Sequence, residues 1–272
     1  MINNIKTINL LSNQTAVSYI GQAGFILKHR DFCILIDPYL SYYVDEHCCT
    51  DDVIWVRNYP PPILAEELNF IDAVICTHAH YDHMDPDTIS RIYEVNKKAK
   101  FITPYPAAKH LITIGIPKEN IIPSFEEKSI TLNGIRITPI PAAHETINLD
   151  ASGNCQEQGY LMDFNGNVIY HSGDSCIYEG LPERIKGADV AILPINGRDE
   201  FRLSRNIIGN MNIQEAVDLA EKASIKVIIP MHFDLYGTNG ADVSIFERTV
   251  QARTPKLSYH VFQLNETYIF SK

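Results

Sequence analysis

Four residues that can bind a metal ion lie within six positions of the chain, in the run His78-Ala79-His80-Tyr81-Asp82-His83. Imidazole nitrogens and carboxylate oxygens are ligands for zinc, manganese and iron, so the run predicts a metal site. A lone histidine is more often a core or surface residue than a ligand, but coincidence does not readily place four candidates together. Such a site favours hydrolysis, because a bound ion lowers the pKa of a water molecule and polarises the bond to be broken.

Three later residues share the context of this cluster. His144, Asp174 and His232 each follow an apolar, strand-like run at the point where a loop begins. Side chains at the ends of strands in packed sheets can converge on one edge, so we expect these three to complete the site. The combined set has five imidazoles and two carboxylates, which is enough for two divalent ions. We expect zinc or manganese rather than iron.

The spacing within the cluster predicts how the ligands are shared. Residues two apart in an extended segment point the same way, so His78 and His80 can hold one ion. Asp82 and His83 lie past the turn and can reach a second. Asp174 is the natural bridge, because a carboxylate has two oxygens. Asp82 is also the candidate catalytic residue, since a ligand close to the bridging hydroxide can orient it or carry its proton.

The elements that position these residues are mostly short apolar strands. Residues 72–77 form a predicted strand that ends at the cluster, and Asp85 followed by Pro86 predicts the start of a helix. His171, three positions before Asp174, is expected to support the ligands from behind. Other strands are expected at residues 16–20, 25–28, 32–36, 101–103, 120–122, 129–132, 135–140, 159–164, 167–170, 190–195, 226–231, 258–264 and 266–270. Further helices are expected at residues 105–113, after Asn212 and at 241–251.

The order of these elements predicts an α+β fold. Two β-rich halves, each followed by helical segments, indicate two sheets packed face to face with helices outside. Asn133-Gly134 and Asn165-Gly166 predict tight hairpin turns within the second half. The sequence contains no internal repeat, low-complexity run or obvious linker, so we expect one domain over residues 1–272.

Composition and charge limit the classes of function. The chain has 272 residues, 45% of them hydrophobic, which is typical of a globular protein that buries its own core. Its net charge of −10 argues against a nucleic-acid partner held by a broad basic face. The sequence lacks both an apolar run long enough to span a bilayer and the pattern of a signal peptide. We therefore expect a cytoplasmic protein with reduced cysteines and no membrane partner.

The residues from Thr77 to His83 match the His-x-His-x-Asp-His signature of the metallo-β-lactamase superfamily, which this chain resembles. The resemblance implies a four-layer αββα sandwich, built from two mixed or mostly antiparallel sheets with outer helices and the site along one edge. It also implies a division of the ligands, in which one ion is held by His78, His80 and His144, the other by Asp82, His83 and His232, and Asp174 bridges.

Finer features resemble the L-ascorbate 6-phosphate lactonase branch of that superfamily, over nearly the whole chain. The segments that carry this resemblance are 21–25 (Gly-Gln-Ala-Gly-Phe), 36–40 (Ile-Asp-Pro-Tyr-Leu), 170–175 (Tyr-His-Ser-Gly-Asp-Ser), 196–199 (Asn-Gly-Arg-Asp) and 229–234 (Ile-Pro-Met-His-Phe-Asp). The branch implies a lactonase-like hydrolase. It is also associated with manganese and with homo-oligomers, which remain open alternatives here.

A cluster of arginines follows the predicted strand at 190–195. Arg198, Arg202 and Arg205 lie within eight residues of an otherwise acidic protein, and arginine suits a phosphate group through forked hydrogen bonds. We favour their use, with Asn196, in binding a phosphorylated small-molecule substrate. The alternative is a solvated loop in which these arginines pair with Asp199 and Glu200.

Residues 41–62 form an irregular segment with aromatic residues, two adjacent cysteines and three prolines at its end. A loop of this length without clear periodicity is unusual in a compact domain and is often functional. A lid over the metal site and a simple surface connection are equally compatible with the sequence.

Three functions compete for this chain. The leading hypothesis is a hydrolase with one or two ions that opens a lactone or ester of a phosphorylated, sugar-like molecule by attack of a bridging hydroxide. The alternative is a phosphodiesterase acting on a small phosphodiester or a nucleic-acid end, which two ions serve equally well. The third is a di-iron redox protein of the same superfamily. It is disfavoured because those relatives typically carry glutamate where this chain has His80.

Overall fold

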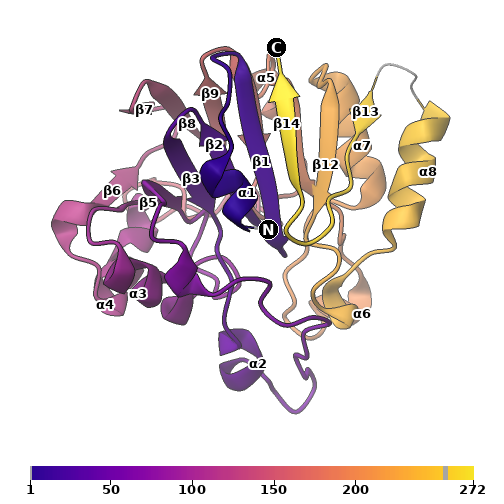
Figure 1. Cartoon of the computed structure of the whole chain (residues 1–272). Helices are drawn as coiled ribbons and strands as arrows, with labels where there is room; N and C mark the ends of the chain where they lie inside the picture. The colour runs from indigo at the N-terminus through magenta and orange to yellow at the C-terminus, as the bar shows by residue number, and fades with distance from the viewer. Residues whose placement is uncertain (1, 254–256) are drawn as a thin grey trace.

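The computed structural model describes residues 2–253 and 257–272, and within them two seven-stranded sheets pack face to face (Figure 1). The first sheet has the order β14-β1-β2-β3-β4-β5-β6 and the second β13-β12-β11-β10-β9-β8-β7. The strands of the first sheet are β1 (Gln14–Gly21), β2 (Gly24–His29), β3 (Phe32–Ile36), β4 (Ala73–Ile75), β5 (Lys100–Pro104), β6 (Ile121–Ser124) and β14 (Thr267–Ser271). Those of the second are β7 (Ile130–Leu132), β8 (Ile135–Pro141), β9 (Gln158–Phe164), β10 (Asn167–His171), β11 (Val190–Pro194), β12 (Val227–Met231) and β13 (Ser258–Tyr259).

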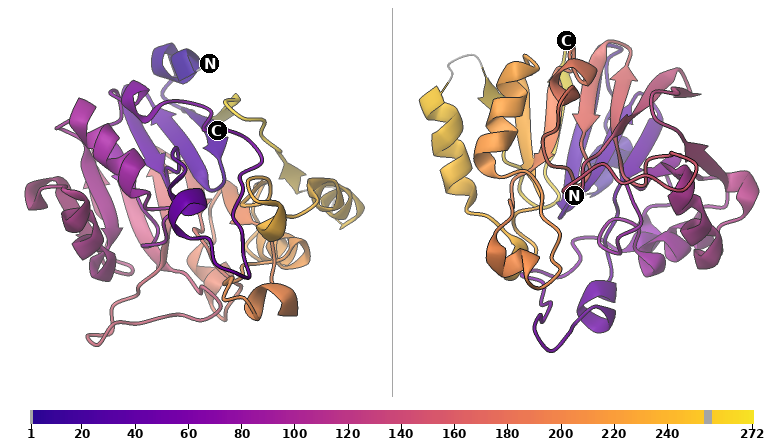
Figure 2. Two further views of the ribbon diagram at one scale, coloured as in Figure 1. Left: turned by 90° about the horizontal axis from the view of Figure 1, so that it is seen from below. Right: turned by 180° about the vertical axis from the view of Figure 1, so that it is seen from behind.

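Helices cover the outer faces of the two sheets. In Figure 1 and in the view from below in Figure 2, α3 and α4 lie on one side of the molecule and α7 and α8 on the other. The helices are α1 (Ile2–Thr7), α2 (Tyr43–His47), α3 (Pro86–Val95), α4 (Ala108–Ile114), α5 (Leu181–Arg184), α6 (Glu200–Leu203), α7 (Ile213–Lys222) and α8 (Val243–Arg253). Single 3₁₀ turns occur at Ala65–Glu67, Tyr105–Ala107, Lys118–Asn120 and Gly237–Asn239. The expected αββα sandwich is confirmed.

The two sheets share one pattern of strand directions. In the described residues each sheet has three antiparallel and three parallel pairings, with the parallel run from β3 to β6 in one and from β10 to β13 in the other. Because β8 and β10 are both antiparallel to β9, they run in the same direction, and β12 shares it. The carboxyl ends of β8, β10 and β12 therefore meet at one edge of the second sheet.

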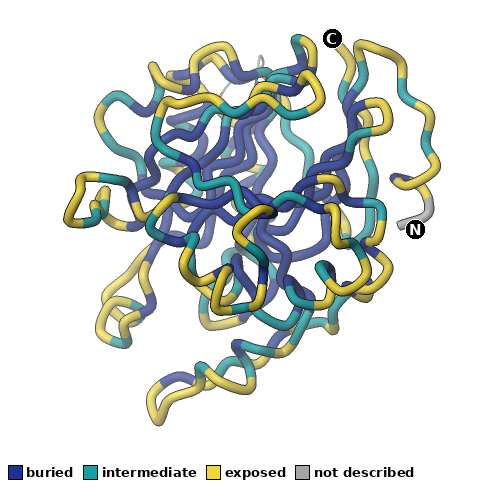
Figure 3. Tube along the Cα trace, turned by 90° about the vertical axis from the view of Figure 1, so that its left-hand side faces the viewer, coloured by how far each residue is buried: buried dark blue, intermediate teal, exposed yellow. Residues whose placement is uncertain are grey.

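Three apolar layers hold the sandwich together. The central layer packs the inner faces of the sheets against each other, with Phe25, Ile75 and Ile192 among its buried members. A second layer lies beneath α3 and α4, and a third beneath α7 and α8. Figure 3 shows the strands buried at the centre of the molecule and the exposed residues concentrated on the peripheral segments. The described residues include no helix that is both long and apolar enough to cross a membrane.

Most predicted elements are present, including the capped start of α3. Asp85 accepts a hydrogen bond from the backbone of Asp87 at 3.1 Å, and Pro86 is the first helical residue. Both Asn-Gly turns close the expected hairpins, with Asn133 and Asn165 at positive φ as a tight two-residue turn requires. The expected strand at 258–264 was wrong beyond Tyr259, where the chain leaves the edge of the second sheet and returns to the first as β14.

Candidate metal centre

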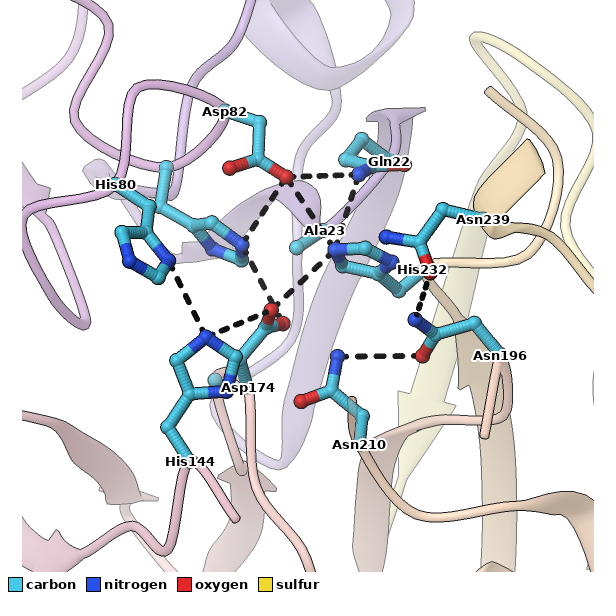
Figure 4. A network of polar contacts seen from close by, with 12 residues as sticks. Gln22, Ala23, His80, Asp82, His144, Asp174, Asn196, Asn210, His232 and Asn239 are labelled. Carbon is cyan, nitrogen blue, oxygen red and sulfur yellow. Dashed lines mark hydrogen bonds and ion pairs between the residues drawn. The ribbon is translucent and has the colours of Figure 1, made fainter. Parts of the chain in front are cut away.

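The seven predicted ligands lie on four loops that meet at one edge of the sandwich. The loop after β4 carries His78, His80, Asp82 and His83, and the loops after β8, β10 and β12 carry the other three. The loops after β8, β10 and β12 follow strands that run in the same direction. The side chains on these loops therefore lie at the same edge of the second sheet. Figure 4 shows residues from these loops turned toward one another.

Three nitrogen atoms form the first group of candidate ligand atoms. His78 Nε2 lies 3.0 Å from His80 Nδ1, and His144 Nε2 lies 3.2 Å from the same His80 atom. All three residues form one group whose ligand atoms are within 4.8 Å of each other. The grouping coincides with the division that the superfamily resemblance implies.

The second group combines one carboxylate with two imidazoles. Asp82 Oδ2 lies 3.5 Å from His83 Nε2 and 3.3 Å from His232 Nε2. Asp174 lies between the two groups: its Oδ1 is 3.3 Å from His83 Nε2, and its Oδ2 is 3.4 Å from His232 Nε2 and 3.9 Å from His144 Nε2. Its two oxygens are thus placed to serve both groups at once.

These spacings fit a divalent ion. Ligand atoms at about 2.0–2.1 Å from a tetrahedral ion lie about 3.3 Å from one another, close to the observed separations. Among the described residues, no hydrogen bond satisfies His83 Nε2 or Asp174 Oδ1, although both atoms are buried. Buried polar atoms are normally satisfied, so these two atoms suit a bound cation between them. The donor set therefore fits one or two divalent metal ions.

Burial and neighbouring charges shift the pKa values of the candidate ligands in different directions. Burial and the neighbouring histidines lower the pKa of His78 well below its usual value, so its nitrogen is available to a metal. Burial also acts to lower the pKa of His83, but the carboxylates of Asp174, Asp82 and Asp37 outweigh it and hold that pKa well above the usual value. His83 thus sits in the strongly negative part of the centre, where a cation is most favoured.

Asp37, at the end of β3, supports two of the ligands and was not anticipated from the sequence as a site residue. Its Oδ2 lies 2.8 Å from His83 Nδ1 and accepts a hydrogen bond from Thr77 Oγ1 at 2.7 Å, while its Oδ1 accepts from Thr77 N at 2.7 Å. Thr77 Oγ1 in turn lies 3.0 Å from His78 Nδ1. A carboxylate at the rear nitrogen fixes which nitrogen of His83 faces the metal. The sequence feature that could have identified Asp37 is its position. It is an acidic residue directly after an apolar, strand-like run and directly before a proline.

His171 lies behind the centre, as expected, and acts on the backbone rather than on a ligand side chain. Its Nε2 lies 2.9 Å from Ala23 O, and the backbone N–H of Gly173 donates to its Nδ1 at 3.1 Å. Burial lowers the pKa of His171, which suits this neutral form with one donor and one acceptor. Gly173 has a positive φ and packs against Thr77 so closely that a Cβ would clash. His171 therefore fixes the turn that presents Asp174.

A cavity of about 230 Å³ opens beside the candidate ligands. The 41–62 segment forms one of its walls through Val44, Cys48 and Trp55. Its lining residues are Val44, Cys48, Trp55, His80, Tyr81, Asp82, His144, Asp174, Asn206, Ile207, Ile208, His232, Tyr236 and Asn239.

Hydrogen bonds tie the 41–62 segment to the loop that carries His232. Asp45 Oδ2 accepts from Tyr39 Oη at 3.0 Å and from Tyr236 Oη at 2.9 Å, and its Oδ1 accepts from the backbone of Arg57 at 2.9 Å. Asn58 N donates to Leu235 O at 2.7 Å. The segment is therefore an anchored wall of the cavity.

The three arginines predicted to bind phosphate do not line this cavity. Arg198 makes two hydrogen bonds of 2.7 Å with the carboxylate of Glu215, and Arg202 Nε donates to Asp199 at 2.7 Å. The guanidinium of Arg205 stacks on the ring of Phe201 at 3.9 Å. The contact between Arg202 and Asp199 matches the alternative of a loop whose arginines pair with acids, whereas Arg198 pairs with the more distant Glu215. Asn196 is also outside the lining and contacts Asn239 from behind.

Comparisons with known proteins agree with this fold and site. The family model described as "Beta-lactamase superfamily domain" matches residues 33–233. A UPF0173 metal-dependent hydrolase of Methanosarcina barkeri is 27% identical over 245 residues, covering 87% of this chain and 91% of the relative.

Two solved structures resemble the whole fold. An isothiocyanate hydrolase from Delia radicum gut bacteria has a TM-score of 0.75 at 18% identity, covering 94% of this chain and 100% of the other. A possible metal-dependent hydrolase from Veillonella parvula has a TM-score of 0.73 at 19% identity, covering 94% and 99%. Because the family model spans most of the chain, including the loops from His78 to His232, this protein belongs to the metallo-β-lactamase superfamily.

Proposed function

We propose that this protein is a metal-dependent hydrolase that opens a lactone or cleaves a related carboxylic ester. The observation that carries the proposal is the convergence of seven candidate ligands, five of which line a cavity of about 230 Å³. The named hydrolases among its relatives support the reaction class, and the resemblance to the lactonase branch supports the choice of a carbonyl substrate. The described residues do not provide a phosphate anchor in the cavity, so we leave a phosphorylated substituent out of the proposal.

The residues of this chain can hold the ions and accept the proton of the attacking water. Divalent ions held by the two groups of ligands would lower the pKa of a water molecule and polarise the substrate carbonyl. Asp82 Oδ2 accepts a hydrogen bond from Gln22 Nε2 at 2.9 Å, and no donor among the described residues reaches Oδ1. Asp82 also lines the cavity, so its Oδ1 is the atom placed to take a proton from the attacking water. Trp55 from the 41–62 segment lines the same cavity.

A two-ion site can also cleave phosphodiesters, so the test must separate attack at carbon from attack at phosphorus. Metal-loaded protein is assayed against γ- and δ-lactones, 4-nitrophenyl carboxylic esters and bis(4-nitrophenyl) phosphate. We expect lactone or ester hydrolysis and little phosphodiester cleavage. Cleavage of the phosphodiester alone would replace this proposal with the phosphodiesterase alternative.

A pair of histidine variants controls for contaminating hydrolases. His144→Ala removes a candidate ligand that is 5% exposed, whereas His110→Ala changes an exposed histidine of α4. We expect the first variant to lose more than a hundredfold in kcat/KM and the second to keep the activity of the natural sequence. Equal activity of both variants would show that the measured hydrolysis is not made at this centre.

A further inference from the structure

We propose that the cavity beside the metal centre receives an uncharged, largely apolar substituent of the substrate, oriented by a hydrogen bond from Asn239, rather than a phosphate. This inference rests on the proposed hydrolase function, because it concerns the group attached to the carbonyl under attack. Three observations support it: the chemistry of the cavity lining, the size of the cavity, and the direction of a chain of amide hydrogen bonds.

The wall of the cavity away from the candidate ligands is mainly apolar. Val44 and Trp55 come from the 41–62 segment, Ile207 and Ile208 from the loop after α6, and Tyr236 from the loop after β12. Ile207 is only 5% exposed, although its side chain borders a cavity. Apolar surface of this kind gains free energy when a ligand removes it from water, and it offers nothing to an ion.

The described residues place no lysine or arginine in that lining. Arg198 is neutralised by its paired hydrogen bonds with Glu215, and Arg202 by its contact with Asp199. Arg57 lies over the rings of Tyr39 and Tyr42 instead of facing the cavity. A phosphate placed against this wall would lose water without gaining a partner, which is costly for a charged group.

The size of the cavity limits the substituent. A cavity of about 230 Å³ lies near the lower end of the range of small-molecule sites. That scale suits a small lactone with a short alkyl chain, or an aryl ester. Trp55 and Tyr236 form an edge-to-face pair with ring centroids 5.0 Å apart, which gives this wall a fixed aromatic surface.

Arg202 determines which end of the Asn239 amide faces the cavity. Its Nη1 lies 3.3 Å from Asn239 Oδ1, and a guanidinium can only donate, so the atom it contacts must be the amide oxygen. Asn196 Nδ2 donates to the same oxygen at 2.9 Å, which leaves Asn196 Oδ1 to accept from Asn210 Nδ2 at 3.2 Å. Figure 4 shows this chain of amides ending beside His232.

The chain of amides leaves a donor at the cavity. With Asn239 Oδ1 occupied by Arg202 and Asn196, the Nδ2 group of Asn239 is the end that can contact a substrate. One neutral N–H donor suits a carbonyl, ether or lactone ring oxygen, and it is too weak a partner for a dianion. Arg202, predicted to bind substrate directly, thus acts as a positioning residue for Asn239.

Matched lactones test the proposal. One γ-lactone carries a butyl side chain, and the other carries a phosphorylated hydroxymethyl group at the same ring position. We expect kcat/KM of the metal-loaded protein to be at least tenfold higher for the butyl compound. A preference for the phosphorylated compound would overturn the inference while leaving the proposed hydrolase function intact.

Binding is measured separately by the fluorescence of Trp55, the only tryptophan of the chain. The ring ethers corresponding to the two lactones cannot be hydrolysed, so they report occupancy of the cavity by changes in tryptophan fluorescence. We expect saturable changes with the butyl ether and none with the phosphorylated ether at the same concentrations. If the butyl ether binds but no lactone or ester is opened, the proposed function fails and the inference about the cavity stands. If the butyl ether does not bind, the inference fails.

Two substitutions that introduce arginine test whether a cation in the cavity changes the preference between the two lactones. Ile208 lines the cavity and is 40% exposed, so Ile208→Arg adds a cation there with little burial; Leu203, 46% exposed and outside the lining, gives the matched control Leu203→Arg. We expect only the first to shift the ratio of kcat/KM values toward the phosphorylated lactone, by about tenfold. Asn239→Ala is expected to raise KM about fivefold and change kcat less. Indifference of the substrate ratio to Ile208→Arg would contradict the proposal.

Discussion

Gln22 Nε2 donates a hydrogen bond of 2.9 Å to Asp82 Oδ2, joining the turn between β1 and β2 to the loop that carries the candidate ligands. The backbone holds Gln22 in place for this contact. Its N–H donates to Tyr59 Oη at 3.3 Å, and its carbonyl accepts from His232 N at 3.0 Å. Gln22 has a φ of 56°, so its local conformation is one that the surrounding contacts must maintain. A residue 60 positions away in sequence therefore orients the candidate catalytic carboxylate.

Replacing this amide should reduce activity without emptying the site. In Gln22→Leu, Asp82 loses a hydrogen bond to a charged group, a contact worth about 1.5–3 kcal/mol. We expect kcat/KM for ester hydrolysis to fall about tenfold to a hundredfold while the bound metal per chain is unchanged. Elemental analysis of the same samples separates the two effects. Loss of a metal ion in the variant would instead make Gln22 a structural support of the ligand loop.

The anchor at Asp45 should control the order of the cavity wall. Asp45→Asn weakens the acceptor shared by Tyr39 and Tyr236, and we expect the free energy of unfolding to fall by about 1–3 kcal/mol. The emission of Trp55 should shift to longer wavelength and proteolysis between residues 48 and 58 should accelerate. Asp51→Asn changes an exposed acid of the same segment and serves as the control. Identical emission in both variants would refute the anchoring role.

Removing metal should lower stability markedly. The centre brings five imidazoles and two carboxylates together, and among the described residues no hydrogen bond satisfies the buried His83 Nε2. An ion that binds only the folded state stabilises it in proportion to the logarithm of its concentration over Kd. We expect chelation to reduce Tm by more than 5 °C, and two equivalents of zinc or manganese to restore it. A Tm that is insensitive to chelator would argue against ions at this site.

Glu157 gives a pH dependence that is independent of the metal ligands. Burial raises the pKa of its carboxyl group from 4.5 to about 7, so the folded state favours the protonated form. This contribution is fully present below pH 4.5 and is lost as the pH rises through 7. We expect metal-free Glu157→Gln to match the natural sequence at pH 5 and to be more stable by about 1–2 kcal/mol at pH 8, after allowance for partial exposure.

Chemical denaturation at both pH values measures this difference. Glu183→Gln, which changes an exposed glutamate of α5, is the control and should show no such change between pH 5 and pH 8. A larger stability gain for Glu157→Gln at pH 5 than at pH 8 would reverse the predicted sign.

The sequence predicted the sandwich and the convergence of the ligands because both depend on local patterns. Apolar runs such as Val190–Pro194 indicate buried strands, and a ligand directly after such a run must lie at the end of that strand. The Asn-Gly pairs likewise determine their own turns. These features need no knowledge of which strands pair.

The sequence could not predict contacts that depend on which strands pair and on which distant side chains meet. Asp37 reaches His83 because β3 and β4 are parallel neighbours, and Gln22 reaches Asp82 because the first turn folds over the ligand loop. The arginines after β11 were assigned to phosphate because the sequence does not show which acids they contact in the fold. Glu215 is 17 residues from Arg198 in sequence, and its pairing follows from the start of α7 beside that loop.

The rate of ester or lactone hydrolysis as a function of bound metal tests the central claim most directly. Metal-free protein is titrated from zero to three equivalents of zinc or manganese, and initial rates are compared with the metal content of the same samples. We predict negligible hydrolysis without metal, a rise with added ions and a plateau by two equivalents, as expected for the groups around His78 and His83. Equal rates with and without metal, or a loaded protein that hydrolyses no ester or lactone, would contradict the account.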